Sequence, residues 1–260
     1  EVALLTNVSL DHCDLLGNTV EEIAVHKAGI IKEGSALFST ETKPEVRRVF
    51  NEAAARTGTS IQYIEPTQHY ETSLPGEHQQ WNAALAAAAA RHLGVADTDI
   101  AHGIKQTHLP ARIEQLQEQP RVILDGAHSP AKIEALVQAL EQFRPWNTLH
   151  VLFAAKETKE LAELIRPLCA LADTVTCTEF QLIDFGSAPA TEAADIFRSI
   201  APDIDVQIEP NPRTAIDQMM AHTAPNDLVL ITGSLYLAGP VRERWIPEQD
   251  ILKARSVFPA

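Results

Sequence analysis

The stretch Arg121-Val122-Ile123-Leu124-Asp125-Gly126-Ala127-His128-Ser129-Pro130 has the pattern of a buried strand, a tight turn and a helix start. Pro130 suits the first helical position, and Ser129 suits the N-cap before it. Asp125 then follows a parallel strand at its carboxyl end, where open α/β sheets bind their ligands, and His128 lies near a positive helix terminus. Helix capping alone is the simpler explanation for part of this pattern. We therefore predict an α/β fold here, with Asp125 and His128 as candidate site residues.

Strand-like and helix-like segments alternate on both sides of this stretch, as expected for a mainly parallel sheet. Ile133, Leu136, Val137 and Leu140 have the spacing of one buried helix face. A domain boundary is expected near residues 107–110, dividing 1–107 from 108–260. Strands are expected at residues 2–8, 35–39, 61–64, 122–124, 149–153, 174–178, 205–208 and 228–232, and helices at 20–28, 44–55 and 78–93.

Composition sets the broad class of the protein. The chain has 260 residues, 45% of them hydrophobic and 22% charged, which predicts a globular protein of one large or two modest domains. Its net charge of -14 disfavours nucleic acids and anionic membranes as partners. The longest apolar run, residues 83–90, is too short to cross a bilayer. Cys13, Cys169 and Cys177 lack C-x-x-C spacing, which favours a reducing, cytoplasmic location. The chain begins without Met, so we expect it to be the interior of a longer one.

The first chemical motif is Leu10-Asp11-His12 after an apolar strand, with Lys27 fifteen residues after His12. At helical spacing Lys27 shares a face with Val20, Ile23 and Ala24, so we expect it to point with these apolar side chains. A buried ammonium is unfavourable unless it is paired, deprotonated or chemically altered. Carbamylation by carbon dioxide would turn it into an anionic oxygen ligand for a divalent cation. The simpler alternative, favoured by how often lysines are exposed, is that the amine reaches solvent and His12 is a polar residue at a strand end.

Two further segments carry polar groups at helix starts. Residues 74–82 form a turn into an Ala-rich helix with Asn82 in its first turns, and an amide there suits recognition of a base edge. A capped surface helix with Trp81 packed against a neighbour explains the same residues equally well. Residues 230–237 end a strand with small polar residues before a helix, whose free backbone amides could hold a carboxylate.

In this order, six motifs resemble those of the folylpolyglutamate synthase and dihydrofolate synthase family of the Mur ligase superfamily. The resemblance spans nearly the whole chain. It implies the C-terminal half of a Mur-ligase-type central P-loop ATPase domain at residues 1–107 and a Rossmann-like α/β C-terminal domain at residues 108–260. The motifs are Leu10-Asp11-His12, Lys27-Ala28-Gly29-Ile30, Gly76-Glu77-His78-Gln79 with Asn82, Pro110-Ala111-Arg112, Asp125-Gly126-Ala127-His128 and Thr232-Gly233-Ser234-Leu235-Tyr236-Leu237.

The resemblance implies an ATP-dependent ligase that joins a folate or dihydropteroate carboxylate to the amine of L-glutamate through an acyl phosphate. It implies ATP and Mg²⁺ as cofactors, small-molecule partners only, and a monomer at full length. Carried over by position, His12 and carbamylated Lys27 would bind Mg²⁺. For ATP, Asn82 would contact the adenine, Arg112 the phosphates and Asp125 the ribose. The incoming glutamate would be bound by His128, Ser234 and, as a weaker candidate, Lys159. Lys27 and His128 would be the catalytic residues.

The sequence also departs from the family's pattern. No G-x-x-x-x-G-K-[ST] loop occurs in the 260 residues, so we expect this chain by itself to show no synthase activity. His26, Ser129 and Ala111 stand where the family usually has Glu, Asn and Gly. Two alternatives therefore stay open. The chain could belong to another amino-acid ligase of the superfamily, or it could be a non-catalytic binding protein.

Overall fold

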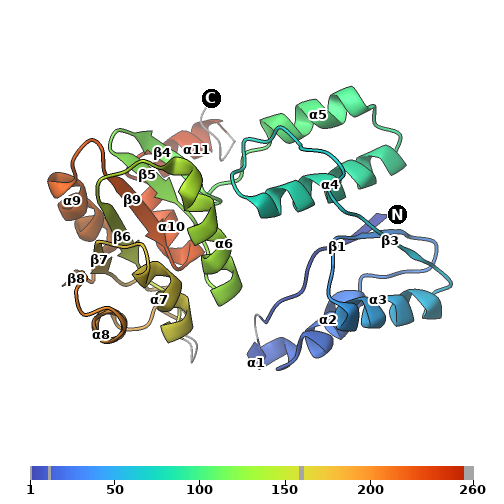
Figure 1. The fold of residues 1–260 in the computed structure, drawn as a ribbon, viewed down its shortest axis with the longest axis horizontal. Helices are drawn as coiled ribbons and strands as arrows, with labels where there is room; N and C mark the ends of the chain where they lie inside the picture. The colour runs from blue at the N-terminus through green and yellow to red at the C-terminus, as the bar shows by residue number, and fades with distance from the viewer. Residues whose placement is uncertain (1, 11–12, 158–160, 255–260) are drawn as a thin grey trace. The chain divides into compact units, whose positions relative to one another are not determined.

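The structure is a computed structural model that describes residues 2–10, 13–157 and 161–254. The chain forms two compact units, Glu1–Thr107 (unit 1) and His108–Ala260 (unit 2). Each unit has its own sheet, and helices accompany the strands throughout (Figure 1). The predicted α/β fold is confirmed.

Unit 1 contains a three-stranded parallel sheet in the order β1-β2-β3. Two layers of helices enclose it, α2 and α3 on one side and α4 and α5 on the other (Figure 1). Its strands are β1 (Val2–Leu5), β2 (Ala36–Ser39) and β3 (Ile61–Tyr63). Its helices are α1 (Cys13–Leu16), α2 (Val20–Ala28), α3 (Pro44–Arg56), α4 (Glu77–His92) and α5 (Asp97–Gln106).

The core of unit 1 is divided between these two sides. Ile23 from α2 and Phe50 from α3 pack with Leu37 of β2 in one cluster. A smaller cluster joins α4 and α5 through Ala87 and Ile100. Alanines on α4 bring its backbone close to its neighbours, so the buried apolar area per residue on this side is modest.

Unit 2 contains a six-stranded sheet in the order β4-β5-β9-β6-β7-β8. Its strands run parallel except for β4, which pairs antiparallel with β5 and has a register irregularity between Gln115 and Gln117. The strands are β4 (Glu114–Glu118), β5 (Arg121–Leu124), β6 (Leu149–Phe153), β7 (Thr174–Cys177), β8 (Asp205–Ile208) and β9 (Leu228–Thr232).

Helices cover both faces of this sheet, and each face has its own apolar cluster beneath its helices. Ile133 of α6, Leu164 of α7 and Phe197 of α8 belong to one cluster, whereas Ile216 of α9 and Leu237 of α10 belong to the other. The helices are α6 (Pro130–Leu140), the 3-10 turn η1 (Glu141–Phe143), α7 (Leu161–Cys169), α8 (Ala190–Ile200), α9 (Pro212–His222), α10 (Leu235–Arg242) and α11 (Glu248–Ala254). A mainly parallel sheet between two helical layers is the Rossmann-like arrangement.

Most predicted elements agree with the structure to within a few residues. The first strand is shorter than expected and ends at Leu5. Beyond it, the backbone amide of Val8 donates to the Glu41 carboxylate at 2.6 Å instead of to a neighbouring strand. Strand β4 was not predicted, since Leu116 is its one apolar residue. Helix α5 was not predicted either.

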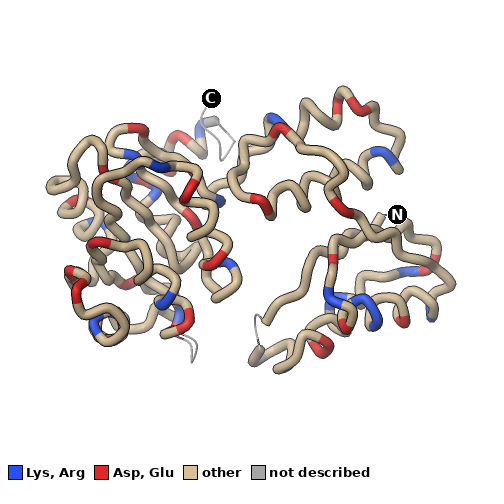
Figure 2. The backbone as a smooth tube through the Cα atoms, viewed as in Figure 1, with Lys and Arg blue, Asp and Glu red and all other residues tan. Residues whose placement is uncertain are grey.

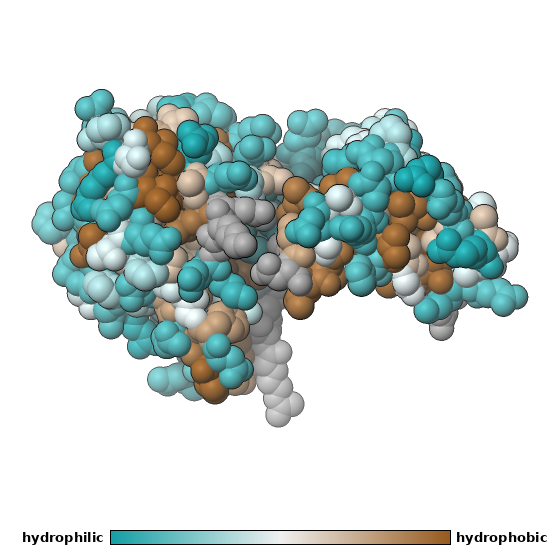
Figure 3. Space-filling model, turned by 90° about the horizontal axis from the view of Figure 1, so that it is seen from below, coloured by the Kyte–Doolittle hydropathy of each residue, from teal (hydrophilic) through white to brown (hydrophobic). Residues whose placement is uncertain are grey.

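The surface is mostly polar and of mixed charge. Lys and Arg are interspersed with Asp and Glu along both units (Figure 2). Apolar side chains form separate patches on an otherwise polar surface (Figure 3), and Leu15, Val25 and Ile183 are among the exposed ones. In the described part of the chain, we find no helix whose length and apolar character would let it cross a membrane.

Candidate functional site

The candidate site lies at the carboxyl edge of the unit 2 sheet. Strand β9 pairs with both β5 and β6, and their last residues lie in adjacent register, Leu124 beside Ile231 and Phe153 beside Thr232. After β5 the chain enters α6 on one face of the sheet, whereas after β9 it enters α10 on the other. Connections that leave on opposite faces create a crevice at the strand ends, the usual ligand position in open α/β sheets.

Asp125 lies at the start of this crevice and is buried. Its Oδ1 accepts the backbone amide of Ala127 at 2.7 Å, and its Oδ2 accepts that of Ile113 at 2.8 Å. The carboxylate therefore fixes two backbone segments, the turn into α6 and the approach to β4.

The hydrogen bonds of His128 define its tautomer. Its Nδ1 lies 2.7 Å from the carbonyl oxygen of Gly126, which can only accept, so Nδ1 carries the proton. Its Nε2 lies 2.9 Å from Nζ of Lys132, which donates. The imidazole is therefore held from both sides, by the Gly126 carbonyl and by the Lys132 side chain. Lys132 adds a cation in the first turn of α6 that the sequence did not single out.

Two buried hydroxyls at the same edge lack partners. Ser129 is 4% exposed and Thr232 is 0% exposed, and neither side-chain oxygen has a hydrogen-bond partner within the described residues. Ser129 occupies the predicted N-cap of α6, but the described residues show no capping hydrogen bond from its side chain. An unsatisfied buried hydroxyl costs about 1–3 kcal/mol. Such groups at neighbouring strand ends fit a polar ligand.

Ser234 begins α10 and caps it, because its Oγ accepts the backbone amide of Tyr236 at 3.1 Å. The preceding residue must be glycine. Gly233 has φ +106°, and a Cβ there would lie 2.5 Å from the Ala154 carbonyl oxygen and 2.8 Å from Cε2 of Phe153. The glycine allows the chain to turn sharply after β9, close to β6, so that α10 begins beside the crevice.

Arg112 joins the same edge from the chain segment before β4. Its guanidinium lies close to Gly126, where an added Cβ would come within 3.2 Å of NH1. The Gly126 amide donates to the Ala111 carbonyl at 2.9 Å, which ties the Arg112 turn to the Asp125 turn. Arg112 therefore lies beside the turn that carries Asp125 and His128.

In unit 1, Asn82 is exposed on α4, and its Nδ2 donates to Oε1 of Gln79 at 2.9 Å. Gln79 is buried and also bonds His78, at 3.1 Å between Nε2 atoms. These contacts fix the Asn82 amide while keeping it accessible. Trp81 is half-buried, as the surface-helix alternative also expects.

The prediction that Lys27 points with the apolar residues of its helix is wrong. Helix α2 buries Ile23, Ala24 and Ala28, and Lys27 is exposed. The buried face of α2 consists of Ile23, Ala24 and Ala28. Lys27 lies beside this face and extends into solvent, where its ammonium needs no partner. His12 and Lys159 lie outside the described residues. Among the described residues, no group of three or more His, Cys, Asp or Glu could hold a metal ion.

Sequence reasoning missed Glu41, whose carboxylate is completely buried. It accepts the backbone amides of Val8, Thr42 and Lys43 at 2.6, 2.8 and 2.9 Å. Nζ of Lys43 donates to the Val8 carbonyl at 2.6 Å. Glu41 therefore holds the chain just after β1, ahead of the Leu10-Asp11-His12 motif. Its polar neighbours in sequence are typical of an exposed loop, so the sequence carried no signal for it.

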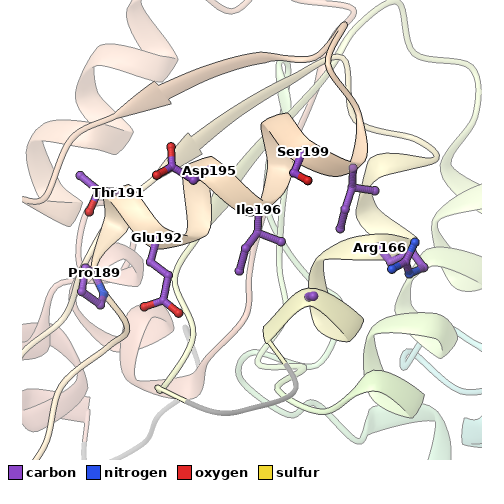
Figure 4. Close-up of a pocket in the computed structure, with 9 residues that line it drawn as sticks. Arg166, Pro189, Thr191, Glu192, Asp195, Ile196 and Ser199 are labelled. Atoms are coloured by element: carbon purple, nitrogen blue, oxygen red, sulfur yellow. The ribbon is translucent and has the colours of Figure 1, made fainter.

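A separate hollow of about 680 Å³ lies between α7 and α8. Glu192 and Ile196 extend from α8 toward it, and Arg166 lies on the α7 side (Figure 4). None of the predicted site residues that the structure describes lines this hollow, so we treat it apart from the candidate site.

Comparisons with known proteins agree with the motifs. Residues 111–235 match the family model described as Mur ligase, glutamate ligase domain. The dihydrofolate synthase/folylpolyglutamate synthase of Bacillus subtilis (strain 168) is 31% identical over 273 residues, which cover 94% of this chain and 62% of that protein.

Two solved structures are similar over nearly the whole chain. E. coli FolC in complex with DHPP and ADP has a TM-score of 0.80 at 26% identity, covering 98% of this chain and 62% of that one. Mycobacterium tuberculosis folylpolyglutamate synthase complexed with ADP has a TM-score of 0.82 at 25% identity, covering 94% and 63%. The chain therefore spans a little over 60% of the length of these relatives.

Proposed function

We propose that this chain is part of a protein of the folylpolyglutamate synthase and dihydrofolate synthase family of the Mur ligase superfamily and that it serves ATP-dependent amide-bond formation. The reaction would join the carboxylate of a folate or dihydropteroate to the amine of L-glutamate. The observation that carries the proposal is the polar edge of unit 2, where Arg112, Asp125 and His128 meet inside the matched residues 111–235.

The chemistry has two steps. An oxygen of the acceptor carboxylate attacks the γ-phosphorus of ATP, ADP leaves, and an acyl phosphate forms. The amine of glutamate then attacks the acyl carbon, phosphate leaves, and the amine loses a proton. Both steps concentrate negative charge, and an acidic protein must offset it locally with fixed donors and cations.

Arg112 is suited to the phosphates, because a guanidinium offers paired donors to phosphate oxygens. Asn82 is proposed to contact adenine and Asp125 the ribose. Support for a nucleotide comes from the E. coli and M. tuberculosis relatives, whose structures contain ADP. Glutamate is assigned to His128, Ser234 and Lys159, and the unpartnered hydroxyls of Ser129 and Thr232 fit its polar groups.

We also assign a divalent cation, Mg²⁺, to His12 and carbamylated Lys27. Because Lys27 is exposed, burial of its ammonium does not support carbamylation, and this assignment rests on the sequence motif. The cation would supply charge compensation for the phosphates. We further propose that the protein acts in the cytoplasm and that its full-length form is a monomer.

The test is ADP binding to the 260-residue chain, measured by calorimetry with and without Mg²⁺. Arg112→Ala should weaken ADP binding about tenfold or more, as loss of a charge-assisted contact worth about 1.5–3 kcal/mol implies. Arg48→Ala is the matched control, since Arg48 is an exposed cation of unit 1 that pairs with Glu52. Equal effects of the two substitutions would contradict the assignment.

The absence of a Gly-rich, Lys-containing loop in the 260 residues favours a second candidate function, binding without catalysis. Incubation of the full-length protein with ATP, glutamate and either dihydropteroate, tetrahydrofolate or a uridine-linked acceptor separates the candidates, because only a ligase turns over. We expect no turnover by this chain alone. Turnover with the uridine-linked acceptor would point instead to another amino-acid ligase of the superfamily.

A further inference from the structure

Arg112 lies in a turn whose backbone is strained on both sides. Ala111 has φ +53° and Ile113 has φ +49°, the left-handed region that disfavours residues with a Cβ. A β-branched residue such as Ile113 rarely occupies it. A conformation of this kind persists only where surrounding contacts enforce it.

Three backbone hydrogen bonds enforce this turn. The Ala111 amide donates to Oε2 of Glu114 at 2.9 Å, and the Ile113 amide donates to Oδ2 of Asp125 at 2.8 Å. The Ala111 carbonyl accepts the Gly126 amide at 2.9 Å. Each residue flanking Arg112 is therefore held by a carboxylate.

Glu114 in turn is held by Arg242, in the last turn of α10. The Arg242 Nε lies 3.0 and 2.9 Å from the two carboxylate oxygens of Glu114, and NH2 lies 2.7 Å from Oε1. The two side chains are only 9% and 17% exposed. A fork-shaped contact of this kind fixes orientation as well as distance. With both carboxylate oxygens fixed, Oε2 stays aligned with the Ala111 amide.

We propose that Glu114 and Arg242 are positioning residues that hold Arg112 toward the phosphate groups of the bound nucleotide. Neither side chain needs to touch the ligand. A buried ion pair that only tied α10 to β4 would not require Glu114 to reach back to the Ala111 amide, nor a strained turn around Arg112. The statement about phosphate rests on the proposed function, whereas the statement about the turn does not.

The first experiment tests the turn without any ligand. Trypsin cleaves after Arg112, and mass spectrometry of the 260-residue chain under native conditions gives the rate of that cut relative to cleavage after Arg198, inside α8 of the same unit. We expect Glu114→Gln and the milder Arg242→Lys to raise this ratio about tenfold, because cleavage follows the population of the opened turn. Glu243→Gln, which breaks the ion pair of Arg213 with Glu243, is the matched control and should leave the ratio unchanged.

The ratio also distinguishes positioning from general stability. If Glu114→Gln accelerates cleavage after Arg112 and Arg198 equally, the pair merely stabilises unit 2 and the proposal is wrong. Arg242→Lys keeps the charge, so it covers the case in which Glu114→Gln does not fold.

The second experiment is a double-mutant cycle on ADP affinity with Arg112→Ala and Glu114→Gln. Glu114→Gln should weaken ADP binding about tenfold in the native background and have no further effect when Arg112 is already alanine. The same loss in both backgrounds would overturn the positioning role. If the unsubstituted chain does not bind ADP, the proposed function fails for this chain, and the cleavage ratio still decides whether the turn depends on Glu114.

Discussion

Unit 1 and unit 2 each use a carboxylate to hold the segment that leads to candidate site residues, fully buried in Glu41 and partly buried in Glu114, and the two carboxylates are supported differently. Glu41 in unit 1 binds the amides of Val8, Thr42 and Lys43, and two of these are its immediate neighbours in the chain. Glu114 in unit 2 depends on Arg242, which is 128 residues away in the sequence. Glu41 holds Val8, 33 residues earlier in the chain, by a direct bond to its backbone amide, whereas the turn of unit 2 also requires the first strand and a late helix of the unit to be packed together.

The hydrophobic cores of the two units also differ, in their size and in the number of strands that they cover. Unit 2 buries two clusters against a six-stranded sheet, and unit 1 divides its smaller core over three short strands. A change in the core should consequently affect each unit by itself. The following predictions test how separate the two units are and how much each depends on close packing.

The largest effect is expected from removing a fully buried phenylalanine in each unit. Phe50→Ala in unit 1 and Phe197→Ala in unit 2 should each lower the unfolding free energy of their own unit by about 3–5 kcal/mol, through lost apolar burial and a cavity. Trp81 reports on unit 1, and Trp146 and Trp245 report on unit 2, so single-tryptophan variants followed by fluorescence in urea resolve the two. If either substitution moves both signals equally, the units unfold as one.

A smaller effect is expected at two glycines with positive φ. Gly233→Ala in unit 2 should destabilise by about 3 kcal/mol, because the left-handed backbone is strained and the new methyl meets Ala154 and Phe153. Gly34→Ala in unit 1 has φ +73° and, among the described residues, no atom within 4 Å of the added Cβ, so about 1 kcal/mol is expected. Urea unfolding of both variants measures the difference, and equal losses would show that close packing at the unit 2 edge is not what requires glycine.

The next prediction concerns pH and Cys177 of unit 2. Burial raises the pKa of this thiol to about 12. Because the folded-state pKa lies above the unfolded value, the stabilisation is complete below the unfolded pKa and is lost as pH rises toward 12. Between pH 8 and 10, unit 2 should therefore lose about 1 kcal/mol more in the native chain than in Cys177→Ala. Urea unfolding at both pH values tests this, and parallel losses would contradict burial of the thiol.

The smallest effect is a gain in stability. Ala111→Gly removes the penalty of a Cβ at φ +53° and should stabilise unit 2 by about 0.5–1 kcal/mol after the extra chain entropy of glycine is counted. Ala86→Gly, at an exposed position of α4 in unit 1, is the control and should destabilise by about 1 kcal/mol. Thermal unfolding of both variants compares them. A loss of stability in Ala111→Gly would mean that the turn carries no strain.

Much of the fold could be predicted because it depends on local pattern. Helix α2 begins and ends as expected, and Thr19 and Glu22 form a capping box at its start. The strands at residues 149–153, 205–208 and 228–232 have the expected bounds, since each is an apolar run or alternation between turn signals. Strand β4 escaped prediction because its polar side chains are held by Arg242 and Trp245, contacts that no local pattern encodes.

The site was predictable to a lesser extent, for a related reason. The sequence placed Asp125 directly after a strand and placed His128 and Ser234 next to helix starts, where the structure has them. Helical spacing misplaced Lys27, because this residue borders the buried face of α2 and periodicity alone does not show whether such a border position is buried or exposed. The strain around Arg112 and the burial of Glu41 arise from tertiary contacts, so the sequence could not reveal them. The ligand roles of all these residues stay predictions.

The Glu114–Arg242 pair also has a consequence for the order in which the protein is made. Synthesis proceeds from the N-terminus, so Arg112 and its turn leave the ribosome long before Arg242 does. Until α10 has been synthesised and has docked, Glu114 lacks the side chain that aligns it, and the left-handed residues beside Arg112 can relax. In unit 2, Arg112 therefore reaches its final orientation only after α10 has been synthesised and packed against the sheet. A nascent chain that lacks α10 cannot hold Arg112 in that orientation.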